Sequence, residues 1–389
     1  MSNAAPGPRQ PLRLIVTGGG TGGHVFPALT TVRTLQRRLG AGGVEVLWVG
    51  AERGLEERVA GEEGIEFRSV ATGKIRRSSS LWRMASAENV RDMGRVPLGV
   101  AQARSLVGGW APDVVLATGG YVAVPVGLAA WMCRRPLVVH EQTVRLGLAN
   151  RTLARVAARV AVSSAPSLEL LPGAVRATAV VTGNPVRAEV LSGQVSRAVA
   201  SLGWKGHDPA LPTVYVTGGA QGSVQINTAV AGALPWLVEQ ANVIHQCGPV
   251  NVESLSGSAA GLAVPGRYYL TGFLRGEVAD VLALADVVVS RSGAGTIAEL
   301  TALGKAAVLI PLASSAGNEQ AHNARYPQDA GAAVALEGVV SPERLWKAVE
   351  PLLTDRAART AMAQRARAFG RPDAAERLAD VILDAAGWR

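Results

Sequence analysis

The feature that most constrains this chain is a glycine-rich turn that directly follows a short apolar run near its start. The run Leu12–Val16 opens into Thr17-Gly-Gly-Gly-Thr-Gly-Gly-His24, and a helical pattern continues from Pro27 to Leu39. A turn of this kind between a strand and a helix exposes backbone N–H groups, which bind phosphate or another anion together with the helix dipole. The same device returns at Thr217–Ser223, after the strand-like run Thr213–Val216. The sequence therefore predicts two α/β halves, each opening with an anion-binding turn.

Further apolar runs separated by turn residues are typical of βα units and a parallel sheet. In the first half we expect strands at Val44–Val49, Val114–Ala117, Leu137–His140 and Val160–Val162. In the second half we expect them at Val243–His245, Tyr268–Leu270, Val287–Ser290 and Ala307–Ile310. The final segment, Ala358–Trp388, is expected to be helical with an interruption at Gly370–Pro372. The pattern predicts two Rossmann-like domains, joined in the region Gly183–Pro212.

Length and composition agree with a globular two-domain chain. Its 389 residues exceed the usual size of one hydrophobic core, and only 18% of them are charged. The two cysteines have no metal-ligand spacing, so a disulfide framework or a structural zinc site is not expected. This cysteine usage favours a reducing cytoplasm. Met1–Pro11 is polar and lacks the apolar core of a signal peptide, which favours a flexible tail.

One apolar stretch, Val114–Cys133, is long enough to cross a bilayer. Gly119, Gly120 and Pro125 interrupt it, however, and split it into a β-rich piece, a turn and a short helix. Buried parallel strands are also continuous apolar runs. We therefore interpret this stretch as a buried strand–loop–helix unit.

The net charge of +9 raises the question of nucleic-acid binding. The basic residues are not gathered into one tract, and no nucleic-acid-binding signature accompanies them, so no nucleic-acid partner is expected. The segment Lys74–Arg104 is locally basic and contains Leu81, Trp82 and Met84. Basic residues mixed with apolar ones suit an anionic membrane surface, but an ordinary solvated helix face explains them equally well.

The second half carries a more specific motif, Ser290-Arg-Ser-Gly-Ala-Gly-Thr-Ile-Ala-Glu299, directly after a predicted strand. Ser292, Gly293 and the following amides would present donors to a diphosphate at the start of a helix near Thr296. Glu299 would accept hydrogen bonds from a vicinal diol such as a ribose, although glutamate is also a common cap at a helix start. The chain has no Asp-x-Asp, so no metal site is expected and a leaving diphosphate would depend on amides and helix ends.

His24 ends the first glycine turn, where an imidazole can remove a proton from an attacking hydroxyl. Its alternative role is packing at the helix start. His140 follows another apolar strand, next to Glu141. Residues 18 to 23 also satisfy the G-x-G-x-x-G pattern of dinucleotide dehydrogenases, but a run this rich in glycine matches many spacings by chance.

Taken together, the motifs resemble family 28 glycosyltransferases of the GT-B fold that add N-acetylglucosamine to a lipid-linked cell-wall precursor. They occur in the family's order across both halves of the chain. The matching segments are Gly18–Pro27, Thr118-Gly-Gly-Tyr121, His140-Glu-Gln142, Gly183-Asn-Pro-Val-Arg187, Gly218-Gly-Ala-Gln-Gly222, Arg291-Ser-Gly-Ala294 with Thr296 and Glu299, and Gln320 with Asn323-Ala324.

The resemblance implies two Rossmann-like domains with parallel sheets that face a central cleft. It places a tail at 1–11, an acceptor-binding and membrane-side domain at 12–186, a donor-binding domain at 187–370, and a helical segment at 371–389 that can return to the first domain. The implied reaction is an inverting transfer of N-acetylglucosamine, without a metal or another cofactor. The donor is UDP-N-acetylglucosamine and the acceptor is undecaprenyl-diphospho-N-acetylmuramyl-pentapeptide. The implied location is peripheral, at the cytoplasmic face of the cell membrane.

The resemblance also implies roles for single residues. His24 would be the general base, with Thr21, Gly22 and Gly23 at the acceptor diphosphate. Glu299 would hold the ribose, while Arg187 and the backbone at Phe273 and Leu274 would meet the uracil. The donor diphosphate and sugar would contact Ala294, Gly295, Thr296, Ile297, Ala298 and Gln320. The basic region that contains Trp82 would touch the membrane.

Two positions depart from the family pattern. Thr143 stands where the family has an asparagine after His-Glu-Gln, and Ala220 replaces a serine in the second glycine turn. Both belong to the side of the site that is expected to bind the donor. The departures leave open a related enzyme that moves a different UDP-sugar to another lipid or specialised metabolite. A non-catalytic sugar-nucleotide-binding module is the alternative of another class.

Overall fold

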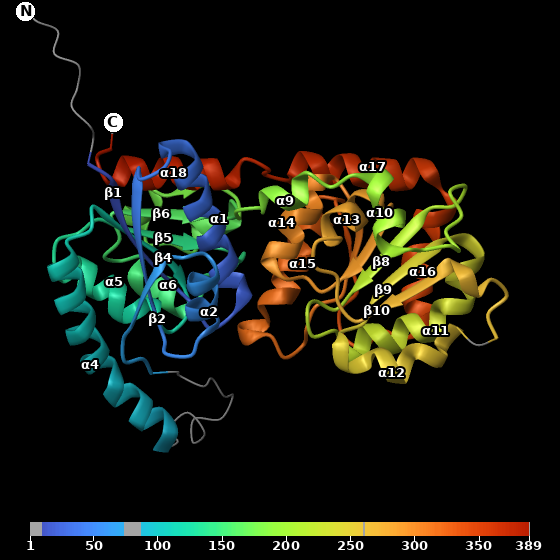
Figure 1. The fold of residues 1–389 in the computed structure, drawn as a ribbon, viewed down its shortest axis with the longest axis horizontal. Helices are drawn as coiled ribbons and strands as arrows, with labels where there is room; N and C mark the ends of the chain where they lie inside the picture. The colour runs from blue at the N-terminus through green and yellow to red at the C-terminus, as the bar shows by residue number, and fades with distance from the viewer. Residues whose placement is uncertain (1–9, 74–86, 260, 389) are drawn as a thin grey trace, which may run out of the picture. The chain divides into compact units, whose positions relative to one another are not determined.

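The computed structural model describes residues 10–73, 87–259 and 261–388 (Figure 1). The chain forms two compact units. The first comprises Met1–Pro185 together with Asp373–Arg389, and the second comprises Val186–Pro372. Residues 74–86 of the basic, Trp82-containing region lie outside the described residues.

The first unit is built on a sheet of seven parallel strands in the order β3-β2-β1-β4-β5-β6-β7. The strands are β1 (Leu12–Gly18), β2 (Val44–Gly50), β3 (Glu66–Ser69), β4 (Val114–Gly119), β5 (Leu137–Glu141), β6 (Arg159–Val162) and β7 (Val180–Val181). The order reverses between β1 and β4, so the chain leaves these neighbouring strands in opposite directions. This reversal marks the place where open α/β sheets bind ligands.

Helices cover both faces of this sheet. They are α1 (Gly22–Leu39), α2 (Leu55–Glu62), α4 (Ala87–Trp110), α5 (Ala123–Met132), α6 (Leu148–Leu153), α7 (Pro166–Glu169), α8 (Gly173–Arg176) and α18 (Ala374–Ala385). Leu14 and Val16 of β1 pack with α1, α2 and α18, whereas Ile15 packs with α4, α5 and α6. Successive strand side chains point to opposite faces, so a strand that is apolar throughout buries both.

The C-terminal helix belongs to the first unit, although the whole second unit precedes it in sequence. α18 packs against α1, as Figure 1 shows, and its Leu378 and Ile382 are fully buried in the core they share. Arg37 of α1 and Glu376 of α18 form an exposed ion pair. Because exposed ion pairs contribute little, the apolar contact is what holds α18 in place.

The apolar stretch 114–133 folds as the buried strand–loop–helix unit that was predicted. β4 is buried along its whole length, the chain turns at Gly119 and Gly120, and α5 follows. Both turn glycines have positive φ, 108° and 82°, a backbone conformation that other residues rarely adopt. Within the described ranges, no helix is both long and apolar enough to cross a membrane.

The second unit repeats the architecture with six parallel strands in the order β10-β9-β8-β11-β12-β13. They are β8 (Thr213–Thr217), β9 (Asn242–Gln246), β10 (Tyr268–Thr271), β11 (Val287–Ser290), β12 (Ala306–Leu309) and β13 (Val334–Ala335). The order again reverses beside the strand that opens the unit, here between β8 and β11. The prediction of two Rossmann-like domains is confirmed.

The helices of the second unit are α9 (Ala188–Leu191), α10 (Val195–Leu202), α11 (Val224–Gln240), α12 (Val252–Leu255), α13 (Val278–Leu284), α14 (Ala294–Leu303), α15 (Glu319–Asp329), α16 (Pro342–Thr354) and α17 (Arg356–Phe369). α11 and α16 cover one face of the sheet, where Ile226 and Leu345 are fully buried. α13, α14 and α15 cover the other face, around Val288. α14 is thus held on the sheet directly after β11.

The first glycine turn rests on a buried carboxylate that the sequence did not single out. Glu56 of α2 is fully buried, and its two oxygens accept hydrogen bonds from the backbone N–H of Gly20 (3.2 Å) and of Ala51 (3.1 Å). A Cβ at Gly19 would lie only 2.3 Å from this carboxylate. Glu56 therefore joins the turn after β1 to the end of β2, and the turn needs glycine to pass so close.

We predict that Glu56→Gln lowers the free energy of unfolding by about 1–3 kcal/mol, because one backbone N–H then faces an amide NH₂ instead of an oxygen. The measurement is urea-induced unfolding of the full chain. Glu62→Gln makes the same chemical change on α2 at an exposed position and should stay within about 0.5 kcal/mol of the parent chain. Equal effects of the two substitutions would show that the carboxylate does not brace the turn.

Candidate active site

The first turn leaves a helix start open toward solvent. Thr21 is the N-cap of α1, but its side chain makes no capping hydrogen bond. Within the part of the chain that the structure describes, the N–H groups of Gly22 and Gly23 have no hydrogen-bond partner. Thr21 and Gly23 are exposed. These free donors at the positive end of an 18-residue helix form a site that favours an anion.

His24 lies in the first turn of α1 and is half-buried. Its Nδ1 is 3.0 Å from Oε1 of Gln142, and its backbone oxygen accepts a hydrogen bond from the Thr118 hydroxyl at 3.0 Å. The turn after β4 passes beside the ring, because a Cβ at Gly119 would lie 3.1 Å from its Nδ1. Two segments that follow β4 and β5 thus fix His24 beside the free N–H groups of α1.

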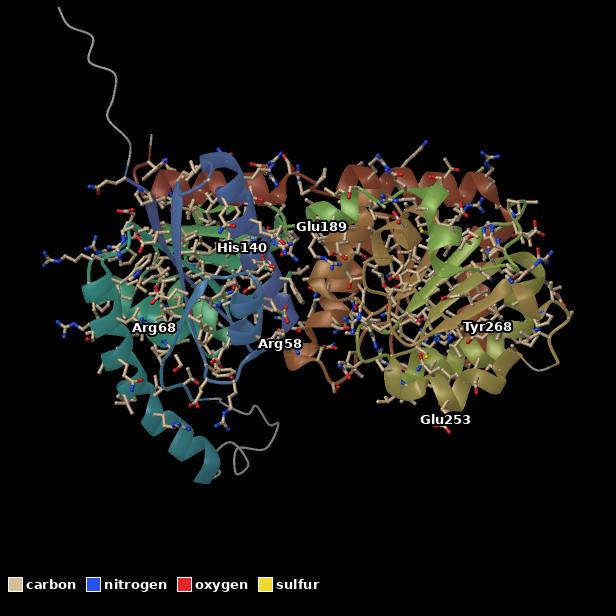
Figure 2. All side chains as sticks on the ribbon, viewed as in Figure 1. Arg58, Arg68, His140, Glu189, Glu253 and Tyr268 are labelled. Carbon is tan, nitrogen blue, oxygen red and sulfur yellow. The ribbon has the colours of Figure 1, made fainter. Side chains whose placement is uncertain are left out.

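The His-Glu-Gln segment at the end of β5 is buried (Figure 2, His140). His140 Nε2 lies 3.0 Å from the backbone oxygen of Gly183, and burial lowers the pKa of its imidazole to about 4. The carboxylate of Glu141 accepts hydrogen bonds from the backbone of Thr143 and Gly147 and from the Asn150 side chain. Glu141 therefore organises the loop after β5 and is not available to a ligand.

Thr143, one of the two departures from the family pattern, belongs to the same loop. Its hydroxyl lies 2.8 Å from Oε1 of Glu141 and 2.5 Å from the backbone oxygen of Arg145. A hydroxyl has one proton to donate, and both neighbours are acceptors inside the loop. Thr143 therefore helps to hold the loop after β5 in its conformation.

In the second unit, the motif 290–299 forms the end of β11 and the start of α14. Ser292 is fully buried, and its hydroxyl donates to the backbone oxygen of Gln320 at 2.8 Å. Gly293 is the N-cap and has no side chain to cap the helix. The residues that follow it are half-exposed, namely Ala294, Gly295, Thr296, Ile297, Ala298 and Glu299. Six of the residues that the sequence predicts for the donor therefore follow one another in the first turns of α14.

Glu299 and Arg187, predicted from separate segments, form an ion pair. Arg187 Nε lies 2.7 Å from Glu299 Oε1, and the glutamate side chain is 17% exposed. Hydrogen bonding to Glu299 and its charge raise the pKa of Arg187 against the opposing effect of burial. The pair leaves the second carboxylate oxygen of Glu299 as a candidate acceptor for a ligand.

Gln320 sits at the start of α15, close to α14. Its Oε1 accepts a hydrogen bond from the N–H of Leu312 at 3.0 Å. Its amide nitrogen has no partner among the described residues. The side chain is half-buried. Gln320 therefore retains donors for a ligand.

The second glycine turn and the Phe273–Leu274 loop are tied together by Gln246, which sequence reasoning missed. Gln246 Nε2 donates to Gly219 O at 3.2 Å, and its Oε1 accepts from the N–H of Leu274 at 3.1 Å. Phe273 is exposed beside the buried Leu274, and Ala220 is exposed at the tip of the turn. Gln246 could not be recognised from the sequence, because glutamine is an ordinary residue at the end of an apolar strand.

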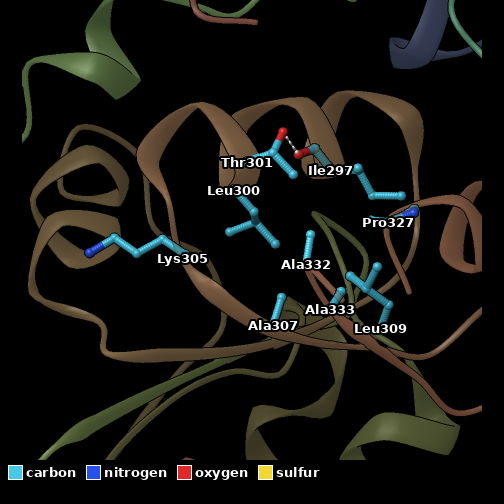
Figure 3. Close-up of a pocket in the computed structure, with 9 residues that line it drawn as sticks. All are labelled: Ile297, Leu300, Thr301, Lys305, Ala307, Leu309, Pro327, Ala332 and Ala333. Carbon is cyan, nitrogen blue, oxygen red and sulfur yellow. Dashed lines mark hydrogen bonds between the residues drawn. The ribbon is translucent and has the colours of Figure 1, made fainter. Parts of the chain in front are cut away.

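The underside of α14 offers no room for a sugar. Figure 3 shows a small apolar pocket between α14 and the sheet, lined by Ile297, Leu300, Thr301, Lys305, Ala307, Leu309, Pro327, Ala332 and Ala333. Lys305 directs its ammonium away to the backbone oxygens of Ala283 and Ala285. The apolar lining makes this pocket part of the packing between α14 and the sheet. In the described ranges, no cluster of His, Cys, Asp or Glu has the arrangement of a metal site.

Comparison with known proteins gives matches over both units. The glycosyltransferase family 28 N-terminal domain matches residues 14–162, and the family 28 C-terminal domain matches residues 213–378. A UDP-N-acetylglucosamine–N-acetylmuramyl-(pentapeptide) pyrophosphoryl-undecaprenol N-acetylglucosamine transferase from Limosilactobacillus fermentum is 36% identical over 378 residues, covering 96% of this chain and 98% of the relative. An enzyme of the same name from Marinobacter nauticus is 35% identical over 381 residues, with the same two shares covered.

Among solved structures, the crystal structure of Acinetobacter baumannii MurG superposes with a TM-score of 0.75 at 28% identity. It covers 96% of this chain and 100% of that protein. The likeness extends over both parallel sheets and the helices that cover them. The chain belongs to glycosyltransferase family 28, with the GT-B fold.

Proposed function

We propose that this protein transfers N-acetylglucosamine from UDP-N-acetylglucosamine to undecaprenyl-diphospho-N-acetylmuramyl-pentapeptide, with inversion at the sugar. The observation that carries the proposal is the match, along nearly the whole of both chains, to relatives named for this transfer. The match spans the residues that form both helix starts. Family membership also rules out a dinucleotide dehydrogenase as the meaning of the first glycine turn.

The first unit has the parts that an acceptor with a diphosphate requires. The free N–H groups of Gly22 and Gly23 and the positive end of α1 would bind the diphosphate. His24 would accept the proton of the attacking hydroxyl, which then forms a bond to the anomeric carbon as UDP leaves. His24 directly follows Gly22 and Gly23 in the first turn of α1, so one bound acceptor could contact both the imidazole and the free N–H groups.

The second unit has the parts that a nucleotide-sugar requires. The N–H groups at the start of α14 would stabilise the negative charge that develops on the departing UDP. Glu299 would accept hydrogen bonds from the ribose hydroxyls while Arg187 holds its other oxygen. The backbone of Leu274, fixed by Gln246, would meet the uracil, and the free amide of Gln320 would donate to a sugar hydroxyl. Transfer by these groups is metal-independent.

The purified protein should turn over UDP-N-acetylglucosamine with a short-chain lipid-linked acceptor. His24→Ala should lower kcat by about 10²–10⁴-fold, because that is the usual contribution of a general base. Its affinity for UDP, measured by calorimetry, should change by less than about twofold, since His24 and the donor residues lie in different units. A near-normal rate in this variant would assign the base elsewhere.

The identity of the sugar is tested in the same assay with a panel of UDP-sugars. Thr143→Asn restores the family residue and should leave the preference for UDP-N-acetylglucosamine unchanged, because among the described residues the Thr143 hydroxyl bonds within its own loop. If another UDP-sugar is turned over well above UDP-N-acetylglucosamine, the proposed reaction is wrong.

Glu299→Ala should weaken UDP binding by about tenfold or more, because each lost charge-assisted hydrogen bond is worth about 1.5–3 kcal/mol. Calorimetric titration with UDP measures this, and a thermal unfolding curve establishes that the variant is folded. Glu253→Ala is the matched control, since Glu253 is an exposed glutamate of the same unit (Figure 2). UDP affinity that is the same in both variants would reject a ribose contact for Glu299.

The acceptor is a membrane lipid, so we infer peripheral contact with an anionic membrane surface through the end of α5. Trp131 and Met132 are 57% and 44% exposed there. Arg134 and Arg104 are exposed as well. Arg134 lies two residues after the end of α5, and the backbone oxygen of Arg104 is in contact with the sulfur of Cys133. An exposed tryptophan among cations suits the boundary between lipid headgroups and water. None of these residues belongs to the stretch 74–86, which contains Trp82.

Charge reversal at Arg104 and Arg134 together should weaken binding to phosphatidylglycerol vesicles by roughly 30-fold or more, at about 1 kcal/mol per basic residue. Binding of the parent chain should also fall as salt rises. The control reverses Arg58 and Arg68, which are exposed on α2 and β3 of the same unit (Figure 2). Vesicle co-sedimentation measures the affinity of both double variants. An equal loss of affinity in the two would show that net charge alone determines binding.

A further inference from the structure

We infer that His140 and Gln142 are positioning residues that hold His24 in the tautomer with its proton on Nδ1, leaving Nε2 free as the base. This inference deepens the proposed function, because it rests on His24 acting on the acceptor hydroxyl. It follows from three linked hydrogen bonds, each of which has only one consistent proton arrangement.

The first bond fixes His140. Its Nε2 lies 3.0 Å from the backbone oxygen of Gly183, and a carbonyl oxygen can only accept. Nε2 of His140 must therefore carry the proton. A neutral imidazole has one N–H, so Nδ1 of His140 is an acceptor. Burial keeps this ring neutral, since its pKa is lowered to about 4.

The second bond fixes the Gln142 amide. One end of the amide lies 3.0 Å from His140 Nδ1 and 2.9 Å from the His140 backbone oxygen. Both neighbours are acceptors, so this end must be the NH₂ group, which donates one proton to each. The opposite orientation would place an oxygen against two acceptors in a buried site. Gln142 is 3% exposed, so water cannot relieve such a contact.

The third bond fixes His24. With the NH₂ group of Gln142 committed to His140, its Oε1 is directed at His24 Nδ1, 3.0 Å away. An amide oxygen only accepts, so Nδ1 of His24 must donate. Nε2 of neutral His24 then holds the lone pair, and it has no hydrogen-bond partner among the described residues. The amide oxygen also stabilises the imidazolium that forms when Nε2 takes a proton.

The arrangement starts at a backbone carbonyl and ends at the proposed base, so it does not depend on a charged partner. A carboxylate in the place of Gln142 would also orient the ring but would place a negative charge beside it, which favours the imidazolium. The neutral amide fixes the tautomer without that electrostatic effect. In serine proteases, loss of the group that holds the histidine tautomer costs about 10⁴ in kcat, which shows how much a tautomer can matter.

The test is nitrogen NMR of the full-length protein with ¹⁵N-labelled histidine, because imidazole nitrogens that carry a proton resonate apart from those that do not. The His24 signals are assigned by their loss in His24→Gln. We expect the parent chain to have a protonated Nδ1 and an unprotonated Nε2 at neutral pH. A proton on Nε2 would overturn the inference, whether or not the protein turns over the proposed substrates.

Gln142→Met keeps the length of the side chain but removes the amide. In the spectrum, the form of His24 with its proton on Nδ1 should no longer be the main one. The kcat should fall by about tenfold or more, with little change in the KM for the donor. Ser163→Ala is the matched control, since the Ser163 hydroxyl donates to the backbone oxygen of Gln142 and not to its side chain. Normal kcat in Gln142→Met, or an equal loss in both variants, would overturn the positioning role.

Gln142→Glu separates positioning from simple packing. One carboxylate oxygen still accepts from Nδ1 of His24, so the tautomer is kept, while the negative charge favours the imidazolium. The other oxygen replaces the NH₂ group that donates to His140, so a thermal unfolding curve must first establish that the variant is folded. The acid limb of the kcat–pH profile should therefore move to higher pH, with rate recovered above it. A profile that keeps the parent chain's acid limb would overturn the inference. The parent chain and its variants could all lack turnover while the spectrum of the parent chain shows the proton on Nδ1 of His24. In that case the proposed reaction is wrong and the tautomer assignment stands.

Discussion

The close contact between the turn after β1 and the turn after β4 is the constraint on which the rest of the first unit depends. The N–H of Gly19 donates to the backbone oxygen of Gly119, and a Cβ at Gly120 would lie 2.3 Å from the oxygen of Gly19. Two backbones can pass this close only where both lack side chains. The glycines therefore serve this contact as much as they serve any ligand, and the contact sets the ring of His24 against the strand ends.

Polar groups complete what the glycine contact begins. Glu56 braces the first turn from β2, and the Glu141 carboxylate organises the loop after β5. Gln142 then reaches from that loop to His24. All three side chains are buried and bonded, so each would be costly to leave unpaired. The hydrogen bonds thus run from the backbone oxygen of Gly183 to the imidazole of His24, whose ring is only half-buried.

Much of this fold could be predicted from the sequence because its central strands are buried on both faces. β4 and β8 are continuous apolar runs next to glycine turns, so pattern alone locates them. The edge strands β3, β7 and β13 were missed, because Glu66–Ser69 is largely polar and the other two have only two residues each. α1 begins at Gly22, five residues before the predicted Pro27, because glycine and proline at a helix start disguise its first turn.

The candidate site likewise contains some residues that the sequence predicts and others that it does not. The positions of His140, at the end of β5, and of His24, after the turn that follows β1, were predictable because parallel strands share one carboxyl edge. Glu56 and Gln246 were not, because their importance lies in backbone N–H and C=O groups that approach them only in the folded unit. No spacing in the sequence relates Glu56 to Gly20. The pairing of Arg187 with Glu299 across 112 residues is likewise a product of the fold.

Helix capping explains why the two glycine turns, alike in sequence, differ in what they can bind. Ser223 caps α11, since its hydroxyl accepts from the N–H of Ile226 at 3.2 Å while Arg291 donates to the same oxygen. That helix start already has its acceptor. α1 begins after a threonine that makes no cap, and α14 begins after Gly293, which has no side chain. Free N–H groups at a helix start are satisfied by a cap, by water or by a ligand. The starts of α1 and α14 also follow a strand end directly, which is why we propose these two uncapped helix starts for phosphate. The second glycine turn instead positions the loop that carries Leu274.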